Sequence, residues 1–179
     1  MIACDDIAKE AQKHIDWDDN VSCEYYPSDG ICIMIDEHVC YANTFFDGTV
    51  VTHDFPKIGK DIGAVPVLRK LVDNGHKLIL FTMRSDIDEV TSDDYNIHKQ
   101  GGKYLSEAVQ WFTDNNIPLF GINENPEQHT WTLSPKPYCH IYIDDAALGC
   151  PLRYDINLSN RGFVNWNRVE SLLIKRQLI

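Results

Sequence analysis

The sequence predicts one α/β domain with a mostly parallel, Rossmann-like central sheet in a three-layer sandwich. Two observations favour this fold class. Short apolar runs at residues 38–42, 77–81 and 141–143 each end abruptly in polar residues, as buried strands do where they reach a ligand crevice. Helical patterns of apolar residues lie between these runs, and such alternation is typical of a parallel sheet.

The first thirty residues are expected to be an extension in front of a core domain at 31–179. Apolar residues at helical spacing, with acidic caps before them, predict an amphipathic helix within 4–18. A turn that ends at Gly30 follows, and the continuous apolar run 31–35 predicts a buried strand.

After the strand at 38–42, an apolar stripe predicts a helix over 64–72. Pro66 suits its first turn, where a missing N–H is tolerated. Asn74-Gly75 ends this helix and the strand at 77–81 follows at once, so a right-handed βαβ crossover is expected.

The second half of the chain continues the alternation. Residues 86–102 are polar and predict a loop, and an apolar pattern over 105–112 predicts the next helix. A short strand at 117–122 and the strand at 141–143 flank an irregular stretch, 123–137, of a length that often serves function. The last helix is expected within residues 164–176, with Lys175 and Arg176 at its carboxyl end.

Composition excludes several classes of protein. The chain has 179 residues, 44% of them hydrophobic, and a formal net charge of −11. Because nucleic-acid binders neutralise phosphates with Lys and Arg, no nucleic-acid partner is expected. The six cysteines lack metal or redox spacing, and no apolar run is long enough to span a membrane. We therefore expect a cytoplasmic protein without a membrane partner.

Four motifs stand at the predicted strand ends. Asp47-Gly48-Thr49 follows the first, Thr82 follows the second, Lys136 precedes the last strand, and Asp144-Asp145 follows it. Each motif alone is weak, but the four in this order resemble the haloacid dehalogenase (HAD) superfamily of phosphohydrolases over roughly residues 31–165. The motifs are separated by too few residues for an inserted cap domain, so the chain resembles the capless phosphatases of this superfamily.

The resemblance implies a magnesium-dependent phosphatase that works through an aspartyl-phosphate intermediate. It implies that Asp47 is the general acid and base, and that Thr82 and Lys136 hold the phosphoryl group. The Mg²⁺ ion would be held by Asp144, by Asp145, by the backbone carbonyl of Asp47 and by the residue at the nucleophile's place, since magnesium prefers oxygen ligands.

The expected substrate is a phosphorylated small molecule, possible classes including nucleotides and nucleotide-derived metabolites. We expect Gly48, Thr49, His53 and Arg84 to bind it, Arg84 through a charge-assisted contact. In the irregular stretch, His129 and Trp131 could frame the leaving group, because an aromatic face suits stacking on a base. The alternative for Trp131 is that it only pins its loop.

The identity of the attacking residue is open. The family places an aspartate two residues before Asp47, where this sequence has Phe45. A loop two residues longer would put Asn43 in that place, and an insertion over 37–45 would put Asp36 there. The third alternative is a site without a nucleophile. Neutral Asn cannot form an acyl phosphate, so Asn43 would mean an inactivated enzyme or a binder.

Two functions therefore remain in view: a phosphohydrolase, and a non-catalytic module of the same fold that binds a phosphorylated ligand. In both, the site is expected to be open. The loops at 86–102 and 123–137, the amino-terminal segment or a second copy of the chain in a homo-oligomer would cover it.

Overall fold

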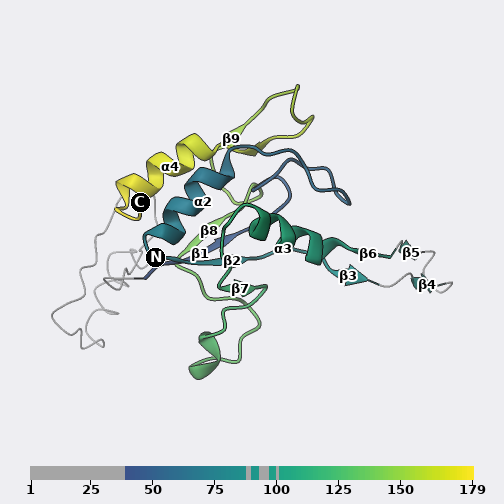
Figure 1. The fold of residues 1–179 in the computed structure, drawn as a ribbon, viewed down its shortest axis with the longest axis horizontal. Coiled ribbons are helices and arrows are strands. Elements are labelled where there is room, and N and C mark those ends of the chain that lie inside the picture. The colour runs from purple at the N-terminus through teal and green to yellow at the C-terminus, as the bar shows by residue number, and fades with distance from the viewer. Residues whose placement is uncertain (1–38, 88–89, 93–96, 100) are drawn as a thin grey trace, which may run out of the picture. The chain divides into compact units, whose positions relative to one another are not determined.

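In the described part of the chain, the central sheet has four strands, all parallel to their neighbours (Figure 1). The computed structural model describes residues 39–87, 90–92, 97–99 and 101–179. The strands are β1 (Tyr41–Thr44), β2 (Lys77–Leu80), β7 (Gly121–Ile122) and β8 (Ile141–Ile143), in the order β7-β2-β1-β8. The predicted α/β, Rossmann-like class is confirmed. The predicted helix within 4–18, the strand at 31–35 and Asp36 lie outside the described residues.

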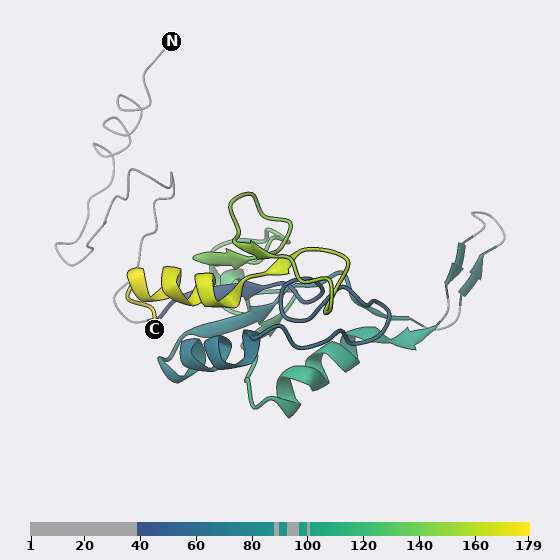
Figure 2. The same cartoon turned by 90° about the horizontal axis from the view of Figure 1, so that it is seen from above.

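Three helices connect and follow these strands. Helix α2 (Ala64–Asp73) links β1 to β2, α3 (Tyr104–Asp114) links β2 to β7, and α4 (Trp166–Lys175) follows β8. Each places an apolar stripe against the sheet, as the sequence pattern predicted. Helices α2 and α4 lie side by side in both views (Figure 2), and Lys70 of α2 pairs with Glu170 of α4 at 2.5 Å.

Side chains alternate between the two faces of the sheet. One face joins the helices in a single apolar core, to which the strands contribute Ala42, Leu78, Leu80, Ile141 and Ile143. The intervening residues, among them Asn43 and Tyr142, therefore point to the opposite face. The β7–β8 connection, with the 3₁₀ turn η1 (Gln128–Thr130), contacts that face, and the Tyr142 hydroxyl donates to the Pro137 carbonyl at 2.5 Å.

The segment 86–102, predicted as a loop, contains short strands instead. Strand β3 (Asp86–Ile87) pairs with β6 (Gly102–Lys103), and β4 (Val90–Ser92) pairs with β5 (Ile97–Lys99), both antiparallel. These strands are short and mostly polar, so the sequence has no alternation of apolar and polar residues from which they could be predicted.

A third small antiparallel pair precedes the last helix. Strands β9 (Leu152–Arg153) and β10 (Phe163–Val164) form it, and Trp166 at the start of α4 donates its Nε1–H to the Thr49 carbonyl at 2.7 Å. This bond fixes α4 to the loop after β1. Among the described residues, no helix has the length and apolar character to cross a membrane.

Candidate functional site

Three of the four sequence motifs follow adjacent parallel strands. Thr44 is in register with Leu80 of β2 and with Ile143 of β8. The residues that follow these strands, Asp47, Thr82 and the pair Asp144-Asp145, therefore meet at the carboxyl edge of the sheet. Met83 and Leu148 at this edge are fully exposed, so nothing in the described part of the chain covers them.

The side chain of Asp47 is paired with Arg84, which lies two residues beyond Thr82. Arg84 donates from Nε to Oδ2 at 2.8 Å and from Nη2 to Oδ1 at 2.6 Å, a bidentate pair. Only 1% of the Arg84 side chain is exposed, against 23% for Asp47. Both oxygens of the expected general acid are therefore engaged by a buried cation.

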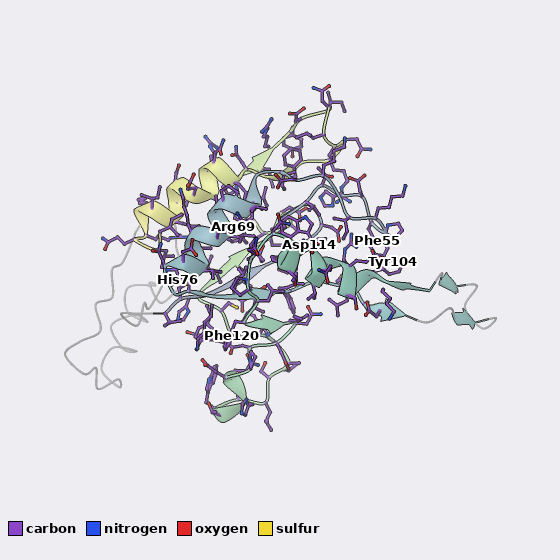
Figure 3. All side chains as sticks on the ribbon, viewed as in Figure 1. Phe55, Arg69, His76, Tyr104, Asp114 and Phe120 are labelled. Carbon is purple, nitrogen blue, oxygen red and sulfur yellow. The ribbon has the colours of Figure 1, made fainter. Side chains whose placement is uncertain are left out.

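Arg84 also holds the loop that follows the motif. It donates to the carbonyls of Pro56 at 3.2 Å and Lys57 at 2.8 Å, and its guanidinium lies over the rings of Phe46 and Phe55. Phe55 in turn packs against Tyr104 with ring centroids 5.1 Å apart (Figure 3). Arg84 was expected to contact phosphate. In the structure its side chain instead connects the segments that follow β1 and β2 with this loop.

Thr82 retains a hydroxyl that can donate. Its backbone N–H donates to the Asn123 side chain at 2.7 Å, and its Oγ1 accepts from the Arg84 backbone N–H at 3.1 Å. Because the acceptor role of Oγ1 is taken up by backbone, its hydrogen can point to a ligand oxygen. The residue that orients Thr82 is Asn123, which follows β7. It was not singled out from the sequence.

Asp145 is fixed by Thr49 and His53. The Thr49 hydroxyl donates to its Oδ1 at 3.2 Å and accepts its backbone N–H at 3.1 Å. His53 Nε2 lies 3.1 Å from Oδ2, although the geometry does not meet that of a hydrogen bond, so the contact is an ion pair only when His53 is protonated. This cluster joins the loop after β1 to the residues that follow β8.

Gly48 makes this close approach achievable. Its φ is +77°, and a Cβ there would lie 2.1 Å from His53 Nε2 and 2.7 Å from Asp145 Cγ. Both the backbone conformation and the space therefore require glycine.

Most side chains expected near the magnesium ion are engaged by protein partners in the described residues. Asp47 is bound by Arg84, Asp145 is bound by Thr49, and Oδ1 of Asp144 accepts the Ala146 N–H at 3.0 Å. Within the described ranges no three His, Cys, Asp or Glu side chains stand close enough to hold a metal. Magnesium is usually held by one or two protein carboxylates with phosphate and water. Of the expected ligands, one oxygen of Asp144 and the backbone carbonyl of Asp47 have no hydrogen-bond partner among the described residues.

The structure corrects the expected position of Asn43. The backbone stays in the sheet beyond β1, because Phe45 N donates to the Ile143 carbonyl at 3.1 Å and Phe81 N to the Thr44 carbonyl at 2.9 Å. No longer loop therefore carries Asn43 to the edge. It lies fully buried inside the strand, and neither amide atom has a partner among the described residues. Phe45 holds the place two residues before Asp47, with its ring against Phe81.

Lys136 does not join the other motifs by any ion pair or hydrogen bond in the described part of the chain. It is exposed, and its Nζ lies over the Tyr142 ring, 5.3 Å from the centroid. Lys136 and Trp131 both line a cavity of about 350 Å³ beside β8. His129 does not line it; its ring instead contacts the Pro126 carbonyl. The expected pairing of His129 with Trp131 around one ligand is therefore not seen.

Comparison with known proteins gives one structural relative and no activity. A solved structure of a conserved protein from Bacteroides thetaiotaomicron matches with a TM-score of 0.55 and 27% sequence identity, covering 78% of this chain and 93% of that chain. No protein-family model and no curated protein matches. The likeness supports the α/β fold.

Proposed function

We propose that this chain is a HAD-like domain that binds a phosphorylated small molecule and does not form an aspartyl-phosphate with its described residues. The observation that carries this proposal is Phe45. It stands at the end of β1, two residues before Asp47, where the family resemblance requires an attacking carboxylate. A phenyl ring has no lone pair to attack phosphorus, so the step that defines these hydrolases lacks its nucleophile.

The pairing of Asp47 supports the same proposal. A general acid must direct a protonated oxygen at the leaving group, within hydrogen-bond reach. Both oxygens of Asp47 instead accept from the Arg84 side chain, which four further contacts hold in place. Asp47 would have to leave this pair before it could transfer a proton.

Binding is supported by what the edge still offers. The hydroxyl of Thr82 can donate, and the negative charges of Asp47 and Asp145 are opposed by Arg84 and, when protonated, His53. These pairs reduce the repulsion that the acidic edge would exert on a phosphate group. Asp144 is the remaining carboxylate of the edge, and none of the described cations pairs with it.

A second candidate is the phosphohydrolysis that the resemblance implies, with Asp36 as nucleophile. It is favoured by the meeting of Asp47, Thr82 and Asp144 at one edge, an arrangement that binding alone does not require. Asp36 lies outside the described residues.

One pair of measurements separates the two candidates. Phosphate release from an aryl phosphate, with Mg²⁺ present, is measured for the natural chain and for Asp36→Asn, and calorimetry follows the binding of a non-hydrolysable phosphonate analogue. Our proposal predicts binding without release, and weaker binding by Thr82→Val. Release that Asp36→Asn abolishes would establish the second candidate, and absence of both binding and release would refute each of them.

A further inference from the structure

The cavity beside β8 has no role in the site at the carboxyl edge. It has a volume of about 350 Å³ and lies between the segment that follows η1 and the outward side of β8. Its lining combines three aromatic rings, those of Trp131, Tyr138 and Tyr142, with the ammonium group of Lys136 and the aliphatic hydroxyl groups of Thr132 and Ser134.

The aromatic walls are exposed and yet fixed. Trp131 is 64% exposed, and its ring stands edge-on to Tyr138 with centroids 5.4 Å apart. Tyr138 is held from behind by the rings of Tyr41 and His140, at 6.1 and 5.1 Å. Tyr142 is anchored by its hydroxyl bond to Pro137. A tryptophan whose only task is to pin a loop would bury its ring, because burial is the source of its stabilising effect.

The polar groups of the cavity suit an anion. Lys136 lies over the Tyr142 ring, and no carboxylate in the described ranges is within ion-pair distance of it. The hydroxyl oxygens of Thr132 and Ser134 each accept a backbone N–H, at 3.2 and 3.3 Å, so their hydrogens can donate to a ligand. The lining contains no Asp or Glu, in a chain whose net charge is −11.

One residue that lines the cavity, Tyr142, lies near the carboxyl end of β8. Tyr142 precedes Asp144 by two residues, which in a strand corresponds to roughly 7 Å between their Cα atoms. A ligand in the cavity can therefore reach toward the edge without crossing the sheet.

We propose that this cavity binds a planar aromatic ring that carries a phosphate, the chemistry of a nucleoside monophosphate. The ring stacks against Trp131 and Tyr138, and the anionic group faces Lys136 and the hydroxyl groups of Thr132 and Ser134. The part of this proposal that concerns the phosphate group rests on the proposed function. The part that concerns the aromatic ring rests only on the aromatic lining of the cavity.

Calorimetric titration of the full chain with four probes tests both parts: AMP, adenosine, ribose 5-phosphate and inorganic phosphate. We expect AMP to bind more tightly than each of the others. Trp131→Ala weakens AMP about tenfold or more, the usual effect of removing one stacking ring, and Trp131→Phe retains most of the affinity. Lys136→Ala lowers AMP to the affinity of adenosine.

The matched controls are an exposed aromatic residue and an exposed lysine that lie outside the cavity. Tyr154→Ala removes an aromatic ring that is 77% exposed and outside the cavity, and Lys103→Ala removes an exposed lysine of β6; neither should change AMP binding. Because Trp131 and Lys136 are exposed, their variants are expected to remain folded, which circular dichroism checks.

The possible failures are distinguishable. If AMP and ribose 5-phosphate bind equally and Trp131→Ala changes neither, the ring site is refuted while phosphate binding stands. Equal affinity for AMP and adenosine, unaffected by Lys136→Ala, would refute the anionic part of the cavity, while the proposed function keeps its own test at Thr82. If none of the four probes binds, the cavity proposal is refuted, and the phosphonate titration with Thr82→Val decides the proposed function separately.

Discussion

Arg84 forms two hydrogen bonds, at 2.8 and 2.6 Å, to the carboxylate of Asp47, a residue 37 positions earlier in the chain. The pair joins the loop after β1 to the segment after β2, and the two carbonyl contacts of Arg84 add the loop at Pro56 and Lys57. This buried cation determines what the edge can do, because it occupies the carboxylate on which acid–base chemistry would depend.

Removal of this cation should be costly. In Arg84→Met, Asp47 keeps its charge without a partner and two loop carbonyls lose a donor, so we expect the free energy of unfolding to fall by about 3 kcal/mol. The control is Arg153→Met, which breaks an exposed pair with Asp155 and should cost about 1 kcal/mol or less. Urea denaturation measures both; equal losses would show that Arg84 has no special structural role.

The buried amide of Asn43 should make the fold less stable than it could be. It is fully buried with no partner among the described residues, so Asn43→Leu should raise the free energy of unfolding by about 1–2 kcal/mol. Asn125 is the matched control, because this buried amide donates to the Tyr138 carbonyl and accepts from the Glu127 N–H, both at 3.0 Å. Asn125→Leu should lower the stability. A loss in both variants would mean that Asn43 has a partner.

Gly48 offers a test of the contact between His53 and Asp145. Gly48→Ala strains a backbone with φ +77° and also displaces the His53 ring, whereas Gly75→Ala strains a similar backbone, φ +84°, with no atom within 4 Å. The strain alone is worth about 1 kcal/mol. We therefore expect Gly48→Ala to cost at least about 1 kcal/mol more than Gly75→Ala in thermal or urea unfolding. Equal costs would place His53 away from this glycine.

The two buried thiols of Cys40 and Cys139 should make the folded protein less stable at alkaline pH. Burial raises the pKa of Cys40 and Cys139 from 9.0 to about 12. Above pH 9 the unfolded chain loses these protons first, so the free energy of unfolding should fall by about 1.4 kcal/mol per pH unit for each thiol until about pH 12. The double variant Cys40→Ala, Cys139→Ala should show a shallower decline between pH 9 and 11 in urea titrations. An unchanged slope would contradict the burial of these thiols.

The sequence was informative where periodicity and strand order decide structure. The helices predicted at 64–72 and 105–112 are found as α2 and α3, and the strand at 141–143 is found as β8. Motifs at the ends of parallel strands meet by topology alone, so the gathering of Asp47, Thr82 and Asp144 was predictable. The same reasoning gave the wrong position for Asn43. It placed Asn43 beyond the strand, but residue type does not show where a strand ends.

Pairings over long separations were not predictable. Nothing in the local pattern connects Arg84 with Asp47 or His53 with Asp145, since each is decided by how loops fold over the edge. A buried, always charged side chain needs a partner, so an arginine beside a predicted strand end was the one available signal. Lys136 has the spacing that the resemblance implies, yet its ammonium group lies over the Tyr142 ring, a favourable cation–π contact.

The most direct test asks whether the chain ever carries a phosphoryl group. The natural protein and Phe45→Asp are incubated with an aryl phosphate and Mg²⁺, quenched in acid, and weighed by mass spectrometry. We predict no added phosphoryl group on the natural chain, while any phosphorylated aspartate in Phe45→Asp would map to position 45. A phosphorylated aspartate in the natural chain, at Asp36 or elsewhere, would contradict the account.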